Sequence, residues 1–112
     1  MIGQGLSSAG RHAEAIARLG DIVTTRRNAA LAPGAEPQDQ RDLATALAAL
    51  ADAYAAAGRR PEACQVYRQG QAVYADMDRR GVLARMDRDY ALRMLSEGMT
   101  RACGSARAEQ SR

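Results

Sequence analysis

The sequence predicts an all-α fold, and composition, hydrophobic spacing and the placement of glycine and proline each point to it. Of the 112 residues, 46% are hydrophobic, but Trp and Phe are absent and only four residues are Tyr. Much of the hydrophobic content is Ala, which favours helices and lets them approach closely. Long runs of β-branched residues are missing. The length suits one domain with one modest core.

The first clear helix is predicted at residues 11–28. It is preceded by a short segment, residues 1–9, which Gly10 separates from it. Residues 29–37 contain two Pro and one Gly and are expected to form a loop. Hydrophobic residues recur in the helix at spacings of three and four and form one stripe: Ala15, Ile16, Leu19, Ile22 and Val23.

The longest helix is predicted at residues 38–57. Gly58 follows it as a C-terminal cap. Pro61 then begins a helix at about 61–79, because Pro is favoured in the first turn. One face of the longest helix carries its large hydrophobic residues: Leu43, Leu47, Leu50 and Tyr54.

A last helix is predicted at about 82–103, after Arg79-Arg80-Gly81. The tail at 104–112 is small and polar, and we expect it to be disordered. Neighbouring helices should pack antiparallel, because the turns between them are short. Large hydrophobic residues recur along the last helix: Leu83, Met86, Tyr90, Met94, Leu95 and Met99.

A spacing of large and small residues recurs in the chain. The middle reads Leu47-x-x-Leu50-Ala51-x-x-Tyr54, Gly58, Ala63-x-x-x-Tyr67 and Gly70. This pattern resembles the tetratricopeptide repeat family, with Leu47 where Trp is common and Tyr67 where Phe is common. The N-terminus keeps the same internal spacing more weakly: Ile2-Gly3-x-x-Leu6, Gly10 and Ala15-x-x-x-Leu19.

The resemblance implies a short solenoid of antiparallel helical hairpins in one domain, with about two repeats and a C-terminal capping helix. A looser likeness links the chain to C-terminal repeat regions of bacterial serine/threonine kinases and signalling regulators. It rests on Glu62-Ala63-Cys64-x-x-Tyr67-Arg68 and Arg80-Gly81-Val82-Leu83, and the chain has no kinase motif. The implied domain, 1–103, consists of repeat one (1–28), a Pro-rich loop (29–37), repeat two (38–80) and the capping helix (82–103).

Repeats of this family bind extended or helical peptides on a concave surface. The resemblance therefore implies a non-catalytic module that binds a peptide or helix of a partner protein on the concave face or the terminal helix. The other interpretation of the Ala-rich concave face is that it packs against a neighbouring helix. The candidate partner-binding residues are Thr45, Ala49, Asp52, Ala56, Arg85, Arg88 and Leu92.

A homodimerising structural domain of a larger bacterial signalling protein is the alternative function. Leu92 and Leu95 lie away from the line of Leu83 and Tyr90, so hydrophobic residues surround more than half of the last helix. Such a wide band suggests a partner, a missing repeat or a second copy of the chain. The other interpretation is that this band closes a small helical bundle.

The residues typical of enzyme and metal sites are missing from the sequence. His12 is the only His, so it forms neither a catalytic triad nor a metal site with other His. We therefore expect no catalytic residue, metal or cofactor. Cys64 and Cys103 lack the close spacing of zinc ligands. They are either reduced, small hydrophobic residues or a disulfide between two antiparallel helices.

The charge distribution argues against a nucleic acid partner. The net charge is +3, and all sixteen basic residues are Arg. They alternate with acids, as in Asp87-Arg88-Asp89, so no basic stripe forms. No stretch is long enough to span a membrane, and no signal peptide is visible. A cytoplasmic location is expected; a periplasmic one is the alternative if the chain belongs to a membrane-bound signalling protein.

Overall fold

The computed structural model describes the backbone of residues 2–110 and the side chains of residues 10–104. The described residues form four α-helices and no strand, which confirms the predicted all-α fold. None of these helices is long and apolar enough to cross a membrane. The elements are α1 (Ile2–Leu31), α2 (Pro37–Ala56), α3 (Arg60–Arg79), a π-helical turn η1 (Asp87–Ala91) and α4 (Leu92–Gln110).

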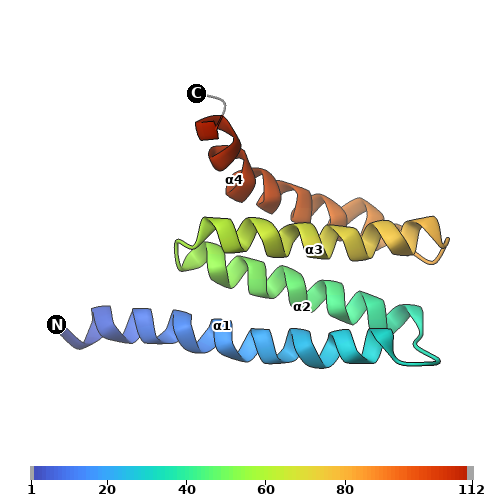
Figure 1. The fold of residues 1–112 in the computed structure, drawn as a ribbon, viewed down its shortest axis with the longest axis horizontal. Helices are drawn as coiled ribbons and strands as arrows, with labels where there is room; N and C mark the ends of the chain where they lie inside the picture. Colours follow the sequence, from blue (N-terminus) through green and yellow to red (C-terminus); the bar gives the residue numbers. More distant parts are fainter. Residues whose placement is uncertain (1, 111–112) are drawn as a thin grey trace.

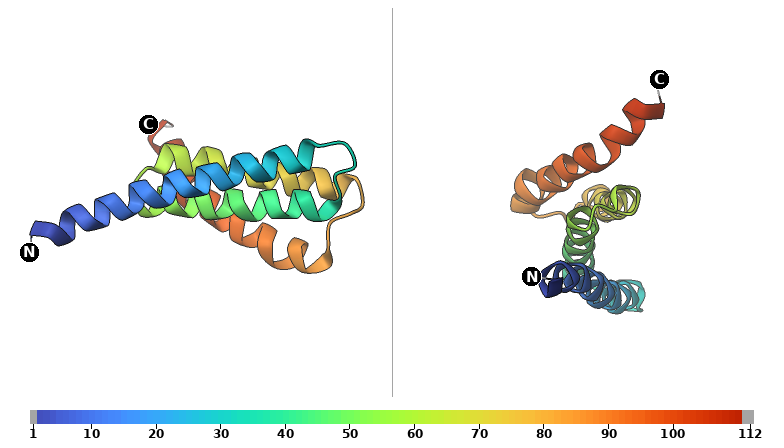
Figure 2. Two further views of the ribbon diagram at one scale, coloured as in Figure 1. Left: turned by 90° about the horizontal axis from the view of Figure 1, so that it is seen from below. Right: turned by 90° about the vertical axis from the view of Figure 1, so that its left-hand side faces the viewer.

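The helices stack in chain order, each antiparallel to the one before it (Figure 1). α1 is the longest, and its N-terminal part projects beyond the end of α2. Seen along the long axis, the stack is bent, so α4 lies on the same side of α3 as α2 (Figure 2). A hollow between α2 and α4 follows from this bend, with α3 behind it.

Two glycines end α2 and α3 in the same way. Gly58 and Gly81 have φ of 77° and 71°, a left-handed conformation that other residues rarely adopt. After α2, the Arg59 amide donates to the Tyr54 carbonyl at 2.9 Å; after α3, the Val82 amide donates to the Met77 carbonyl at 2.9 Å. These Schellman motifs satisfy carbonyls at the helix ends. The C-terminal cap predicted at Gly58 is confirmed.

The first helix differs from the prediction. α1 runs unbroken from Ile2 to Leu31, so the turn expected at Gly10 and the helical hairpin expected within repeat one are absent. A single Gly costs only about 1 kcal/mol relative to Ala inside a helix, and α1 contains no Pro to stop it. The loop predicted at 29–37 is correspondingly shorter and covers residues 32–36.

The last predicted helix also differs. Residues 82–84 are not helical, and the helix that begins at Arg85 passes through the π-helical turn before α4 starts at Leu92. The tail predicted to be disordered at 104–112 continues α4 to Gln110, and residues 111–112 lie outside the described range. A helix with no Pro or left-handed Gly at its end has no local signal to stop it.

The core lies mainly between α2 and α3. Ala44, Ala51 and Ala63 are completely buried, so these two helices approach closely, as the Ala-rich composition predicted. Leu47 and Met77 are the largest completely enclosed side chains. α1 adds Val23, and α4 adds Leu95 and Ala102. The other buried hydrophobic residues are Leu43, Ala46, Leu50, Val66, Tyr67 and Tyr74.

Candidate functional site

A groove lies between α2 and α4, with α3 as its floor. Its volume is about 310 Å³. We call it the α2–α4 groove. It is lined by Thr45, Ala48 and Asp52 from α2, Tyr67 and Tyr74 from α3, and Tyr90, Ala91, Met94, Leu95 and Arg101 from η1 and α4.

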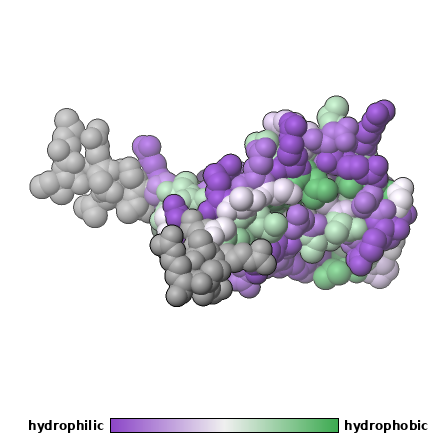
Figure 3. Space-filling view, turned by 90° about the horizontal axis from the view of Figure 1, so that it is seen from above, coloured by the Kyte–Doolittle hydropathy of each residue, from purple (hydrophilic) through white to green (hydrophobic). Residues whose placement is uncertain are grey.

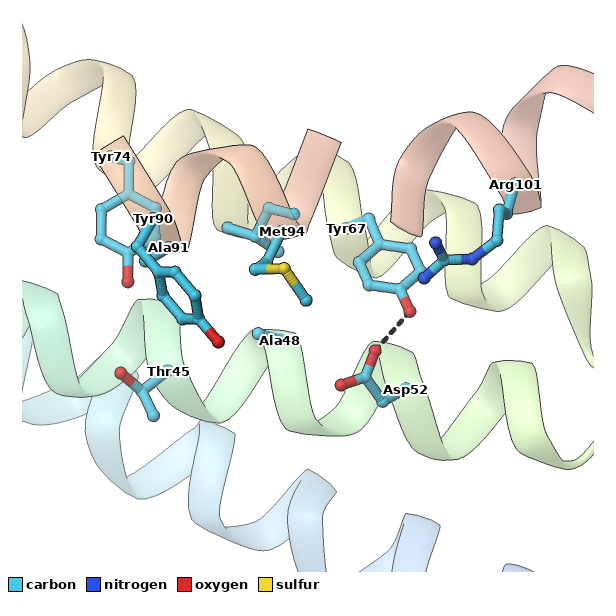
Figure 4. Close-up of a pocket in the computed structure, with 10 residues that line it drawn as sticks. Thr45, Ala48, Asp52, Tyr67, Tyr74, Tyr90, Ala91, Met94 and Arg101 are labelled. Carbon is cyan, nitrogen blue, oxygen red and sulfur yellow. Dashed lines mark hydrogen bonds between the residues drawn. The ribbon is translucent and has the colours of Figure 1, made fainter. Parts of the chain in front are cut away.

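The groove has an apolar middle and two polar ends (Figure 4). Met94 faces Ala48 across the middle. Thr45 and the hydroxyl of Tyr90 lie at one end, and Asp52 and Arg101 lie at the other. Of the four Tyr in the chain, three line this groove, so the scarce aromatic surface is concentrated here.

Asp52 and Tyr67 form the polar pair at the end of the groove near Arg101. The Tyr67 hydroxyl donates a hydrogen bond to Asp52 Oδ1. Burial and this carboxylate together raise the pKa of Tyr67 from 10.0 to about 12. Arg101 makes no ion pair or hydrogen bond with any other described residue. Its guanidinium lies beside Tyr67, and its positive charge slightly opposes the rise in the pKa of that hydroxyl.

The opposite end rests on a buried polar cluster. Burial raises the pKa of Tyr74, and the negative charge of the Asp87 carboxylate adds to this rise. Asp87 is only 5% exposed and is the single buried charged residue in the described range. Its Oδ2 lies 3.0 Å from Nε of Arg41 on α2, but the pair lacks the alignment of a hydrogen bond.

The π-helical turn η1 carries Asp87 into this buried position. A π turn inserts an extra residue into a helix and occurs frequently at functional sites. Here the ion pair between Asp87 and Arg41 ties the start of the last helical segment to α2. Sequence reasoning treated Asp87 as one of several surface charges and missed it, because a π turn leaves no clear signal in composition or periodicity.

An exposed hydrophobic stripe continues the groove along η1 and α4. Met86, Tyr90 and Met94 follow one another at intervals of four residues and are 73%, 59% and 45% exposed. Seen from the side of α3 and α4, hydrophobic side chains gather over the half of the molecule away from the N-terminus of α1 (Figure 3). We call these three residues the α4 stripe. Exposed hydrophobic residues in continuous arrangement mark interaction surfaces.

The predicted partner-binding residues divide into two groups. Thr45 and Asp52 line the groove. Ala49 is half-buried and Ala56 is exposed, and both lie outside the groove lining. The remaining predicted residues lie elsewhere on the last helical segment: Arg85 pairs with Asp89, Arg88 pairs with Asp78, and Leu92 packs against the core.

The face of α4 that lines the groove is therefore different from the predicted one. The prediction assumed one regular helix over 82–103, which would turn Arg85, Arg88 and Leu92 toward α2. The structure instead presents Tyr90, Met94 and Arg101. The spacing of Met86, Tyr90 and Met94 was the available signal, since three large hydrophobic residues at intervals of four form one stripe.

A disulfide joins Cys64 of α3 to Cys103 of α4, with the two Cα atoms 5.0 Å apart. Of the two alternatives left open for these cysteines, this is the one present in the structure. The two residues are separated by 39 positions, and a cross-link that closes a loop of this length removes chain entropy worth about 4 kcal/mol from the unfolded state. The disulfide therefore stabilises the folded chain, and it joins α4 covalently to α3.

Gly98 permits the close approach of α4 to α3. A Cβ atom at this position would lie 2.7 Å from the ring of Tyr67, so any larger residue would push the helices apart. Gly70 on α3 similarly faces Leu95, though a Cβ there would meet only a methyl group at 3.3 Å. The sequence pattern included Gly70 but gave no reason to select Gly98.

Two further findings bear on function. Among the residues that the structure describes, no group of three or more His, Cys, Asp or Glu side chains is placed to hold a metal ion.

No protein-family model matches the chain, and no curated protein or solved structure shows significant similarity to it. Inferences about function therefore rest on the geometry of the groove.

Proposed function

We propose that the chain is a non-catalytic, tetratricopeptide-like interaction module that holds an apolar helical segment of a partner protein in the α2–α4 groove. The single observation that carries this proposal is the α4 stripe. Tyr90 and Met94 are half-exposed although they line a groove with an apolar middle. Covering such residues removes hydrophobic surface from water, which stabilises a complex.

The dimensions of the groove favour a helix as the bound element. From Tyr90 to Arg101 the helical wall rises about 16 Å, or about three helical turns. An amphipathic helix presents hydrophobic residues every three or four positions, which matches the interval between Tyr90 and Met94. Met side chains adapt to irregular partners, and Ala48 on the opposite wall leaves room for a large side chain.

The polar ends of the groove would set the orientation of the bound helix. Asp52 and Arg101 carry opposite charges at one end, and the hydroxyls of Thr45 and Tyr90 lie at the other. Complementary charges mainly determine specificity and orientation, while the apolar middle supplies most of the affinity. A partner helix with one acidic and one basic residue near one end fits this arrangement.

The location of such a module is part of the proposal. The sequence likeness suggested a docking portion of a bacterial signalling protein, with the cytoplasm as the first expectation. Disulfides persist in oxidising compartments such as the bacterial periplasm and are rare in the cytosol. The Cys64–Cys103 bond therefore supports the periplasmic alternative.

Peptide selection tests this function. Peptides selected from a random displayed library on the oxidised protein would be titrated against the wild type and against Met94→Asp. We expect the variant to bind at least about tenfold more weakly, a loss of about 1.4 kcal/mol, since a buried charge replaces a hydrophobic contact. Leu31→Asp is the matched control, because Leu31 is 77% exposed on α1, away from the groove.

If both variants bind the peptide equally weakly, or if neither binds it more weakly than the wild type, the peptide site lies elsewhere. Molar mass in solution separates the module from a homodimer. A monomer has a mass of 12.0 kDa. A protein of twice this mass that becomes monomeric in Met94→Asp would show that a second copy, rather than a partner protein, covers the α4 stripe.

A further inference from the structure

The α2–α4 groove and the disulfide share one helix. Met94 and Arg101 line the groove from α4, and Cys103 follows Arg101 by two positions. Whatever fixes the position of Cys103 therefore also fixes the groove wall. Cys64, its partner, lies near the start of α3, which forms the groove floor. The disulfide thus joins the wall to the floor.

The non-covalent attachment of α4 beyond Leu95 consists of few contacts: Gln71 of α3 donates a hydrogen bond to the Ser96 hydroxyl at 3.3 Å, and the ring of Tyr67 packs on Gly98. The buried residues of this part are Gly98 and Ala102, which bring almost no side-chain surface into the core, and Met99 is only half-buried. Hydrophobic stabilisation scales with the apolar area removed from water, so these residues contribute little. The disulfide is consequently the main tether of residues 96–103.

The other end of the last helical segment is held independently of the cysteines. Arg41 of α2 pairs with the buried Asp87, and Asp78 of α3 pairs with Arg88. Leu95 is 3% exposed and packs on Gly70. These contacts lie at or before the middle of the groove. Breaking the disulfide would therefore free the C-terminal half of α4 while η1 stays in place.

We infer that the Cys64–Cys103 disulfide is a redox latch: a dithiol reductant opens it, releases residues 96–103 from α3 and thereby weakens partner binding in the groove. One thiolate of the reductant attacks the sulfur of one cysteine, which breaks the protein S–S bond, releases the other cysteine as a thiolate and forms a mixed disulfide. The second thiolate of the reductant then attacks the reductant's own sulfur in this mixed disulfide and releases the attached cysteine as a thiolate. The protein gains two thiols, and the reductant becomes a cyclic disulfide. Both cysteines are half-buried rather than enclosed, so a small reductant can reach them.

Hydrogen exchange tests the latch without any ligand. Oxidised protein, protein reduced with dithiothreitol and the double variant Cys64→Ser/Cys103→Ser would be compared by mass spectrometry. We expect exchange at residues 96–103 to accelerate at least about tenfold more than exchange at residues 43–51 and 66–77 in the reduced and double-variant proteins, because the core residues lose only the protection that follows from lower global stability. Dithiothreitol should change nothing in the double variant.

Two outcomes would overturn the latch. Unchanged exchange at 96–103 would mean that packing alone holds α4. Equal loss of protection in α2 and α3 would mean that the disulfide supports the whole fold rather than one helix.

The link between the latch and binding rests on the proposed function, and a second measurement separates the two. A peptide selected on the oxidised protein would be titrated against the reduced protein, with at least about tenfold weaker binding expected. Release of 96–103 without any change in affinity would overturn the control of binding. If no selected peptide depends on Met94, the proposed function fails, and hydrogen exchange still decides whether the latch exists.

Discussion

The α2–α3 hairpin and α4 are held to the protein in different ways. Where α2 meets α3, completely buried residues such as Ala44, Leu47 and Ala63 let the two helices interlock along their lengths. α4 contributes one large buried side chain, Leu95, and its later turns rely on Gly98, Ala102 and a disulfide. We call the α2–α3 hairpin the platform and α4 the wall of the groove. The difference suggests that the platform is rigid and that the wall is attached to it mainly by the disulfide.

The largest expected effect on stability comes from removing the Cys64–Cys103 disulfide. Cys64→Ser/Cys103→Ser should lower the free energy of unfolding by about 4 kcal/mol, because the unfolded chain regains the entropy of the closed loop. Urea denaturation of the oxidised wild type and the double variant measures this loss. Reduced wild type serves as the control and should match the variant. A loss below about 1 kcal/mol would contradict the importance assigned to the cross-link.

Damage to the platform should have the next largest effect. Leu47→Ala removes a side chain that is 1% exposed, and the cavity should cost about 3 kcal/mol. The same denaturation experiment measures it, and the loss should be similar in oxidised and reduced protein because Leu47 lies in the hairpin. Ile22→Ala, at a position 44% exposed on α1, is the control and should cost less than about 1 kcal/mol.

A substitution at the contact between platform and wall should have a smaller effect. Gly98→Ala places a methyl group against the ring of Tyr67 and should cost about 2 kcal/mol. Gly20→Ala is the matched control, since Gly20 lies inside α1 with nothing within 4 Å of the added Cβ. That change should stabilise the protein by about 0.5–1 kcal/mol, as Ala favours the helix. Equal effects of the two substitutions would contradict the close approach of α4.

A further effect appears only at high pH. The pKa of Tyr67 is raised from 10.0 to about 12 in the folded protein. Protonated Tyr67 is favoured in the folded protein, so its full contribution to the free energy of unfolding is present below pH 10.0. This contribution is lost as the pH rises from there to about 12, because the unfolded protein loses the proton first. Tyrosinate absorbance should show a group that titrates near pH 12 and disappears in Tyr67→Phe. Titration of every Tyr near 10 would contradict the buried pair with Asp52.

The platform could be predicted from the sequence because its signals are local and regular. α2 and α3 begin and end within about two residues of the predicted bounds, since hydrophobic periodicity and the turn at Gly58 agree. The length of α1 could not be predicted from Gly10 alone, because a helical Gly and a turn Gly look the same in a sequence. Whether an isolated Gly breaks a helix depends on its surroundings.

The groove was only partly predictable, for a physical reason. Thr45 and Asp52 belong to the regular helix α2, and their face followed from its periodicity. The facing residues Tyr90, Met94 and Arg101 depend on how η1 turns the last helix, which local sequence does not specify. The disulfide depends on the axial offset of two helices, which is decided by packing contacts such as that of Gly98 with Tyr67.

The most direct test of the account is to map a bound peptide on the folded protein. Backbone amide spectra of the oxidised, isotope-labelled chain would be recorded with and without a peptide selected on it. The account predicts that the largest shifts fall on both walls of the groove, at Thr45, Ala48 and Asp52 on α2 and at Tyr90, Met94 and Arg101 on the opposite wall. Shifts confined to α1, or to the face of α4 that carries Leu92, would contradict it.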